Sequence, residues 1–350
     1  MSTFYKLTIK EVKRETPQTI SVVFNVPLEF QDFYKFVAGQ YLNLKLTLDG
    51  KEIRRAYSIC TSPTAGELRI AIKAIKNGTF STFANEQLKE GSVLEVGTPE
   101  GRFTFEPHPE KQRNYMAFVA GSGITPVMSI LQSVLQQEPK SSFVLVYGNK
   151  SPEDTIFYHQ LNELQSQFLG RLSVHYVFSQ KNVDRQLFGR IDKSVVNFVH
   201  NKHVGQEFSK YYLCGPEEMI NVVNATLKEK NVAEKDVKFE LFSASPTIEN
   251  TADSATVEHT KITVLVDGDQ ETFEMSSKQT LLEAALKQGL DAPYSCQGGV
   301  CSSCIAKITS GSAVMKKNTI LTDKEIASGL ILTCQAHPTS AEITVDYDDV

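Results

Sequence analysis

The chain has 350 residues, of which 41% are hydrophobic, with 36 Lys plus Arg against 41 Asp plus Glu. That length and composition suit two or three domains with ordinary cores, and a net charge of −5 without a basic stripe excludes a nucleic-acid-binding protein. No signal peptide and no run of about 18 apolar residues occurs, so we expect neither secretion nor a membrane span, and a reducing cytoplasmic location.

Residues 1–108 predict an antiparallel β-barrel. Alternating apolar and polar residues recur at short intervals, with turn signals between them, in "YKLTIKEV", "TISVVFNV", "YLNLKLTL" and "LRIAIKAI". Within this region "RRAYSI", Arg54 to Ile59, combines two arginines with a tyrosine and a serine. An arginine in a strand is by default solvated and a tyrosine by default in the core, so this segment alone assigns no function.

Residues 109–243 predict an α/β domain with a mostly parallel sheet. "YMAFVA" has the pattern of a buried strand, "GSGITP" that of a glycine turn, and the apolar residues that follow recur at helical spacing. A turn of this kind at a helix N-terminus suits an anionic pyrophosphate, although Gly121 and Gly123 lack the third glycine of the Rossmann fingerprint. Strands and helices continue to alternate, so "GSGITP", "YGN" and "CGP" should each end a strand, where such sheets bind ligands.

Residues 244–260 predict a linker, because they are rich in Ser, Thr, Ala and acidic residues and contain no aromatic residue. Residues 261–350 then predict a small α+β domain with a β-grasp arrangement. "KITVLVDG" and "ETFEMS" form a predicted hairpin, "TLLEAALKQGL" a helix and "AEITVDY" a closing strand. This domain holds 7 Lys, no Arg and 12 Asp plus Glu, so all the net negative charge lies on it. An acidic domain favours a partner with a basic docking face, or is acidic only for solubility.

Four cysteines of that domain predict a metal centre. Cys296, Cys301 and Cys304 have the spacing C-x4-C-x2-C, and Cys334 follows after 29 residues, as in plant-type [2Fe-2S] ferredoxins. A zinc ribbon is the alternative, but it would show two C-x2-C pairs and this chain has one. Gly298 and Gly299 fit a loop around a cluster, because glycine lets backbone N–H groups approach sulfur closely. The four cysteines are therefore the predicted ligands of a [2Fe-2S] cluster.

The motifs taken together resemble those of the ferredoxin-NADP reductase superfamily. Arg55, Tyr57 and Ser58 match its R-x-Y-S motif, and "FVAGQYLNL", "KNGTFSTF" and "GTPEGRF" are similar to other parts of its flavin domain. The resemblance implies FAD on the barrel, with Tyr57 against the ring, Ser58 near N5 and Arg55 at a phosphate; FMN is the alternative, as in phthalate-dioxygenase-type reductases. The flavin-binding candidates are Arg55, Ala56, Tyr57, Ser58, Lys73, Gly78, Phe80, Ser81 and Thr82.

The second domain continues the resemblance. "AGSGITP" is similar to the family's nicotinamide-site turn, and "CGPEEM" implies that Cys214 lies near nicotinamide C4, in a packing and positioning role rather than as a nucleophile. Ser58, Cys214 and Glu240 are the implied catalytic residues, and Phe242 is implied to approach the flavin. Further nucleotide-binding candidates are Gly121, Ser122, Gly123, Thr125, Pro126, Ser179, Lys181, Gly215, Pro216 and Met219.

Nucleotide selectivity follows only from the family. NADP-selective relatives often have Ser-Arg where this chain has Ser179, Gln180 and Lys181. Lys181 is either a point charge for a 2′-phosphate or a solvated lysine. The resemblance favours NADPH over NADH.

The domain order resembles that of reductases of multicomponent oxygenases. Among these it is most similar to the phenylacetyl-CoA epoxidase class, while similar reductases serve Rieske oxygenases, steroid hydroxylases, acyl desaturases and hybrid-cluster proteins. NAD(P)H gives up a hydride and a [2Fe-2S] cluster accepts one electron, so we expect the flavin to convert between them and the cluster to reduce a partner oxygenase. The alternative is a redox carrier or sensor whose reductase domains act only as a scaffold, and this alternative predicts no nucleotide oxidation.

Overall fold

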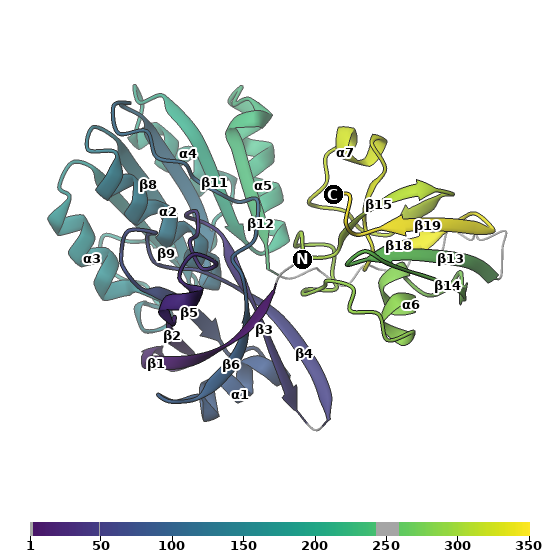
Figure 1. Cartoon of the computed structure of the whole chain (residues 1–350). Helices are drawn as coiled ribbons and strands as arrows, with labels where there is room; N and C mark the ends of the chain where they lie inside the picture. Colours follow the sequence, from purple (N-terminus) through teal and green to yellow (C-terminus); the bar gives the residue numbers. More distant parts are fainter. Residues whose placement is uncertain (1–2, 49, 243–258) are drawn as a thin grey trace. The chain divides into compact units, whose positions relative to one another are not determined.

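The structure, a computed structural model, describes residues 3–48, 50–242 and 259–350. These residues form two compact units, one spanning Phe4–Leu241 and the other consisting mainly of Phe242–Val350 (Figure 1). The larger unit contains the predicted barrel and the predicted α/β domain, and the smaller unit contains the four clustered cysteines. Most of the linker predicted over 244–260 lies outside the described residues, and its last two residues, 259 and 260, already belong to strand β13 (His259–Val266).

A six-stranded antiparallel sheet forms the barrel, in the order β4-β3-β6-β1-β2-β5. The two end strands meet because Ile59, directly after β4, pairs with Ile70 of β5. Alternate residues such as Leu7, Ile9 and Leu42 point inward and are buried. The elements are β1 (Phe4–Thr16), β2 (Thr19–Asn25), β3 (Tyr41–Leu48), β4 (Lys51–Ser58), β5 (Leu68–Lys73), α1 (Thr79–Gln87) and β6 (Val93–Gly97).

The α/β domain is built on a six-stranded sheet in the order β10-β9-β8-β7-β11-β12, with every pair parallel. Its carboxyl ends carry the predicted "GSGITP", "YGN" and "CGP" segments, so this prediction of the sequence is confirmed. The elements are β7 (Asn114–Ala120), α2 (Ile124–Gln137), β8 (Ser142–Asn149), α3 (Tyr158–Gln167), β9 (Leu172–Phe178), β10 (Leu187–Phe188), α4 (Lys193–Lys202), β11 (Phe208–Gly215), α5 (Glu217–Glu229) and β12 (Val237–Leu241).

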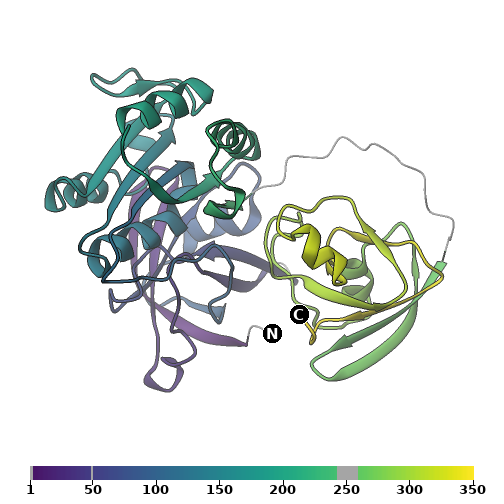
Figure 2. The same ribbon diagram turned by 90° about the horizontal axis from the view of Figure 1, so that it is seen from above.

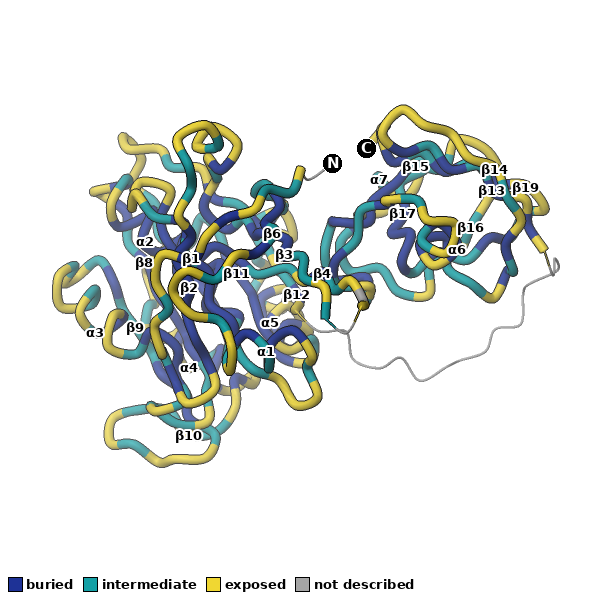
Figure 3. The backbone as a smooth tube through the Cα atoms, turned by 60° about the horizontal axis from the view of Figure 1, so that its bottom comes forward, coloured by how far each residue is buried: buried dark blue, intermediate teal, exposed yellow. Residues whose placement is uncertain are grey.

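One hydrophobic core joins the barrel to the α/β domain. It contains alternate residues of β7 and β8, the buried face of α2, and barrel residues such as Phe103 and Phe105. Hydrogen bonds reinforce it: Ser129 Oγ donates to the Thr61 carbonyl at 2.6 Å, and Lys238 Nζ donates to the Thr104 carbonyl at 2.7 Å. Figure 2 shows the purple and blue barrel strands beside the teal elements of the α/β domain, and Figure 3 shows the central strands buried and the connecting loops exposed. A site between these two domains is therefore rigidly positioned.

The smaller unit is an α+β fold around a five-stranded sheet in the order β14-β13-β19-β15-β17, with β16 and β18 as a separate pair. The predicted hairpin, helix and closing strand are confirmed as β13–β14, α6 and β19, and β19 runs parallel to β13. The elements are β13 (His259–Val266), β14 (Asp269–Ser276), α6 (Leu281–Lys287), β15 (Ile305–Ser310), β16 (Ala313–Met315), α7 (Asp323–Ala327), β17 (Leu330–Leu332), β18 (Ala336–Pro338) and β19 (Glu342–Asp346).

None of the helices among the described residues is long and apolar enough to cross a bilayer.

Candidate functional site

Glycines bring the carboxyl ends of β7 and β11 into close contact. A short 3-10 turn, Gly121–Gly123, leads from β7 into α2, and a Cβ on Gly123 would lie 2.2 Å from the Cys214 carbonyl oxygen. Gly215 has a φ of +157°, and a Cβ there would lie 2.8 Å from Met219 Cε. Larger residues at either position would force these strand ends apart, so the "GSG" and "CGP" segments form one surface.

Ser58, Cys214 and Glu240 come together where the barrel meets this surface. Glu240 pairs in register with Cys214 on the neighbouring strand, and Ser58 ends β4. Burial raises the pKa of Glu240 to about 8, and a hydrogen bond with Ser58 partly opposes this rise. The Oε2 atom of Glu240 is buried and has no hydrogen-bond partner among the described residues. The pair therefore holds a carboxylic acid that is protonated at neutral pH.

The thiol of Cys214 is fully buried. Burial raises its pKa well above the ordinary value, and the nearby Glu240 carboxylate adds to the effect. A thiol that stays protonated is a poor nucleophile. This agrees with the expectation that Cys214 packs and positions rather than reacts.

The flavin-binding candidates lie on β4, β5 and the N-terminal turn of α1. The Tyr57 and Phe80 rings are 5.6 Å apart, while Arg55 is exposed at the barrel surface. Helix α1 begins directly after Gly78, where a Cβ would lie 2.4 Å from Ser81 Oγ. A helix N-terminus with free N–H groups suits a phosphate, so the placement fits a flavin nucleotide with its phosphate at α1.

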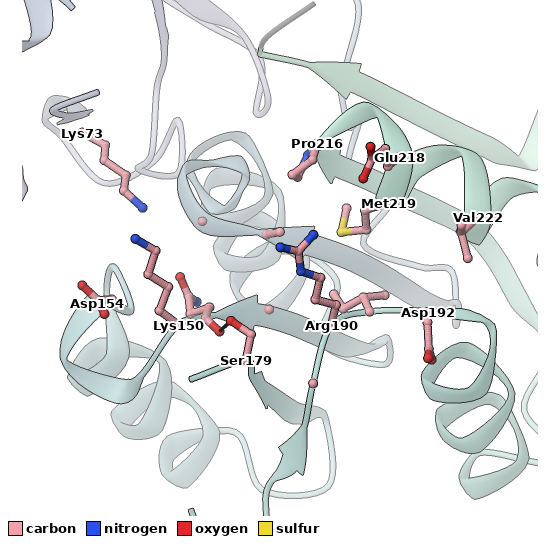
Figure 4. Close-up of a pocket in the computed structure, with 16 residues that line it drawn as sticks. Lys73, Lys150, Asp154, Ser179, Arg190, Asp192, Pro216, Glu218, Met219 and Val222 are labelled. Carbon is pink, nitrogen blue, oxygen red and sulfur yellow. Dashed lines mark hydrogen bonds between the residues drawn. The ribbon is translucent and has the colours of Figure 1, made fainter. Parts of the chain in front are cut away.

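A cavity of about 440 Å³ opens at the carboxyl edge of the parallel sheet and reaches the barrel (Figure 4). Five residues that line it were predicted from the sequence, namely Lys73, Gly121, Ser179, Pro216 and Met219. The Nδ2 atom of Asn149, another lining residue, is buried without a hydrogen-bond partner among the described residues. An unpartnered buried donor fits a site that receives a polar ligand. The remaining lining residues are Ala120, Gly148, Lys150, Asp154, Gly189, Arg190, Ile191, Asp192, Glu218 and Val222.

Three cations face this cavity. Lys73 and Lys150 point toward the same space, and Arg190 extends its guanidinium into it (Figure 4). Burial lowers the pKa of Lys73; Asp154 opposes the effect and Lys150 adds to it. Positive charge held close together in a partly buried space favours an anionic ligand such as the diphosphate of a dinucleotide.

Several predicted residues lie elsewhere. Lys181 is outside the cavity lining, is 52% exposed at its side chain and forms an ion pair with Glu153. Phe242 directly follows β12 and is 39% exposed. Gly123 and Gly215 shape the strand ends, and Thr125 Oγ1 donates to the Ser122 carbonyl at 3.0 Å. The roles predicted for these residues remain predictions.

Sequence reasoning missed Lys150 and Arg190. Lys150 follows "YGN", which was recognised as a strand end, so this lysine could have been found by reading one residue further. Arg190 lies between β10 and α4, and its neighbour Asp192 caps α4 by accepting from Val195 N at 2.9 Å. No local motif indicates that this loop returns to the cavity.

The four cysteines of the smaller unit meet in one place. All are free thiols; Cys304 and Cys334 are buried, and Cys296 and Cys301 are half-buried. The thiols of Cys301 and Cys334 hydrogen-bond to Cys296 and hold its pKa below the ordinary value. Cys304 in turn contacts Cys334. Residues from one loop and one distant turn therefore converge as the sequence spacing predicted.

The surroundings of these thiols fit an iron–sulfur cluster. Gly298 N donates to Cys296 Sγ at 3.3 Å, so backbone N–H groups already point toward the ligand sulfur. The Oγ atom of Ser295 is buried without a hydrogen-bond partner among the described residues. Four thiolates with nearby N–H and O–H donors are the donor set that a [2Fe-2S] cluster uses.

Family models match all three parts of the chain. An oxidoreductase FAD-binding domain matches residues 6–105, an oxidoreductase NAD-binding domain matches residues 118–225, and a 2Fe-2S iron-sulfur cluster binding domain matches residues 264–339. These matches confirm the predicted fold class and the predicted cofactors FAD, [2Fe-2S] and NAD(P)H.

Individual relatives match along nearly their whole length. A component of the 1,2-phenylacetyl-CoA epoxidase of Escherichia coli K12 is 38% identical, with 99% of each chain covered. The ferredoxin reductase component of a 3-ketosteroid-9-alpha-monooxygenase from Rhodococcus rhodochrous is 32% identical, covering 97% of this chain and 96% of its own. Phthalate dioxygenase reductase has a similar fold, with a TM-score of 0.63, 24% identity and 98% of each chain covered.

Proposed function

Because the chain belongs to the family of flavin and iron–sulfur reductases that serve multicomponent oxygenases, we propose that its partner is a phenylacetyl-CoA epoxidase. The chain itself is an NAD(P)H-dependent oxidoreductase with FAD and a [2Fe-2S] cluster, and it passes electrons to an oxygenase. The observation that carries the choice of partner is the 38% identity over 99% of both chains. A reductase of a steroid monooxygenase is the second candidate, on 32% identity over almost the same length. A cytoplasmic location, where thiols stay reduced, is part of this proposal.

In this proposal the barrel binds the flavin. Arg55 binds a phosphate of the flavin nucleotide, the N-terminal turn of α1 binds another, and Tyr57 packs against the ring. The close approach at Gly78 and the 5.6 Å separation of the Tyr57 and Phe80 rings support this placement. Bound FAD supplies the exchange between two-electron and one-electron chemistry, and the cluster supplies one-electron delivery.

The same proposal gives Ser58, Glu240 and Cys214 a shared role. Ser58 holds the Glu240 carboxyl, and burial keeps a proton on it at neutral pH. Cys214, which is buried beside Glu240, would pack against the nicotinamide and help to orient it. These residues orient the reacting atoms and exclude water, and the Glu240 carboxyl holds a proton that it exchanges during turnover.

The cavity is the proposed nucleotide site. Lys73, Lys150 and Arg190 provide charge for the phosphates of NAD(P)H, and the unpartnered amide of Asn149 provides a donor. Arg190 presents a planar fork of donors that suits a phosphate better than an exposed lysine does. We therefore favour NADPH, with Arg190 rather than Lys181 as the residue that distinguishes it from NADH.

Cys296, Cys301, Cys304 and Cys334 are the proposed cluster ligands. Residues 261–350, which carry these cysteines, have a net charge of −5, so electron transfer to the oxygenase should be steered by charge and should slow as salt rises. Reduction of ferricyanide, a small anion, should respond to salt differently.

Reconstitution tests the proposal directly. The purified chain is combined with NADPH, a phenylacetyl-CoA epoxidase and phenylacetyl-CoA, and epoxide formation is followed at several ionic strengths. We expect nucleotide oxidation to be coupled to epoxide. If nucleotide oxidation never yields epoxide while a ketosteroid monooxygenase is driven efficiently, the proposed partner is wrong and the reductase assignment stands.

A further inference from the structure

The loop that carries the first cluster cysteines contains an unfavourable backbone conformation. Gln297 has a φ of +50° and Gly299 a φ of +70°, both in the left-handed region. Glycine adopts this region readily, but a residue with a side chain does so only when its surroundings hold it there. Something outside the loop must therefore support Gln297.

The side chain of Gln335, immediately after the fourth cysteine, provides that support. Its Nε2 atom donates to the Gln297 carbonyl at 3.1 Å and to the Cys334 carbonyl at 3.0 Å. One amide thus connects the loop of the first three cysteines to the turn of the fourth. The backbone carbonyl of Gln335 accepts a hydrogen bond from Lys316 N at 3.0 Å, so Gln335 is itself held by a third segment.

A second side chain holds the same loop two residues further along. Thr319 Oγ1 donates to the Gly299 carbonyl at 2.8 Å. The fit is tight, because a Cβ on Gly299 would lie 2.9 Å from Gln335 Cγ and 3.0 Å from the Lys317 carbonyl oxygen. Between these two anchored carbonyls lies Gly298, whose N–H points at Cys296 Sγ. Fixing the carbonyls therefore fixes the direction of the N–H group that faces the ligand sulfur.

We propose that Gln335 is a positioning residue for the iron–sulfur centre: its amide ties the two ligand segments together and holds the loop N–H groups toward the ligand sulfurs. The inference rests on the proposed function, in which the four cysteines bind the cluster. Gln335 contributes no ligand atom and no proton. It acts through the carbonyls of Gln297 and Cys334, and Thr319 holds the same loop separately through the Gly299 carbonyl.

The test uses the full-length protein with its cluster. Gln335→Met keeps the length of the side chain and removes both donated hydrogen bonds. Hydrogen-bonded groups around metal ligands typically account for roughly 10–100-fold in metal affinity, so we expect iron to be lost to a chelator about tenfold faster or more. The g values of the reduced cluster, measured by electron paramagnetic resonance, should also shift. Thr319→Val removes the hydrogen bond to the Gly299 carbonyl. It should also speed the loss of iron and shift the g values, and it serves as the test variant if Gln335→Met does not take up the cluster.

Gln270→Met is the matched control. It is the same Gln-to-Met substitution, but Gln270 is exposed on β14 and lies outside the cysteine loop. The control should keep the wild-type rate of iron loss and the wild-type g values. If Gln335→Met and Thr319→Val both match the wild type in these two measurements, the inference is overturned. If the wild type itself shows no [2Fe-2S] absorbance, the proposed function fails and this inference fails with it. The two failures are therefore distinguishable.

Discussion

The two redox sites of this chain are built in opposite ways. The cluster site takes three of its four ligands from nine consecutive residues, Cys296 to Cys304, and the fourth from one turn of the same unit. The nucleotide cavity takes its lining from the barrel strand β5, from the ends of β7 and β8, from loops after β7, β8, β9, β10 and β11, and from helix α5. A site made within one loop leaves a fixed spacing in the sequence. A site assembled from many strand ends leaves only scattered residues.

The first prediction concerns the cluster site and replaces one ligand sulfur by oxygen. Cys301→Ser should remove or badly perturb the iron–sulfur absorbance, because serine lacks the thiolate that a [2Fe-2S] cluster requires. Reduction of one-electron protein acceptors should then be abolished. Ferricyanide reduction through the flavin should survive, since the barrel and cavity lie in the other compact unit. An undisturbed cluster spectrum in this variant would end the ligand assignment.

The second prediction concerns the distributed site. Glu240→Gln keeps the shape of the side chain but cannot exchange a proton, so steady-state nucleotide oxidation with ferricyanide should fall by roughly 100-fold. Because the Glu240 pKa is raised to about 8, the acid is protonated at neutral pH and loses its proton as pH rises through that value. The wild-type rate should therefore decrease above about pH 8, and the variant should lack this inflection. Glu229→Gln, at an exposed ion pair with Lys193, should change neither.

The third prediction tests which of two cationic residues, Arg190 or Lys181, determines the preference for NADPH over NADH. Arg190 lines the cavity, whereas Lys181 pairs with Glu153 outside the lining. A hydrogen bond to a charged group is worth about 1.5–3 kcal/mol, so Arg190→Ala should lower the NADPH/NADH ratio of kcat/KM by roughly 10–100-fold. Lys181→Ala should leave that ratio unchanged. If Lys181→Ala lowers the ratio and Arg190→Ala does not, Lys181 is the residue that selects NADPH, as the sequence motif indicates.

The contrast between the cluster site and the nucleotide cavity shows which site residues the sequence could predict. The cysteine spacing and the strand-end glycines rest on local geometry, and the structure brings the four thiols together and sets the two glycine segments side by side. Arg190 could not be found in this way, because its position depends on how the loop between β10 and α4 returns to the sheet edge. Gln335 was missed for the same reason: its contact with Gln297 spans 38 residues. Side chains that act across the fold leave no periodic or spaced signal.

The fourth prediction has the smallest effect and concerns acid stability. His175 on β9 and His203 after α4 place their Nε2 atoms 2.9 Å apart, which ties together two of the elements adjoining the cavity. Burial, with smaller effects of Lys202 and His203, lowers the pKa of His175 to about 4. The unfolded chain therefore binds more protons than the folded chain between pH 6.5 and pH 4, and stability is lost as pH falls through this window.

Thermal unfolding at several pH values checks this fourth prediction. His175→Gln cannot take up the proton, so its Tm should depend less on pH than that of the wild type, by about 2–4 °C between pH 7 and pH 5. His159→Gln, on α3, is the control and should follow the wild type. Parallel curves for wild type and His175→Gln would show that the histidine pair is not the acid-sensitive contact.

The central claim is that both sites are loaded and connected in one chain. Anaerobic titration of the full-length protein with NADPH measures this most directly, with flavin absorbance and the electron paramagnetic resonance signal of the reduced cluster followed together. We predict uptake of about three electrons per chain, two by FAD and one by the cluster. Cys301→Ser should take up about two, with no cluster signal. A wild-type protein whose flavin is reduced while its cluster stays oxidised would contradict the account.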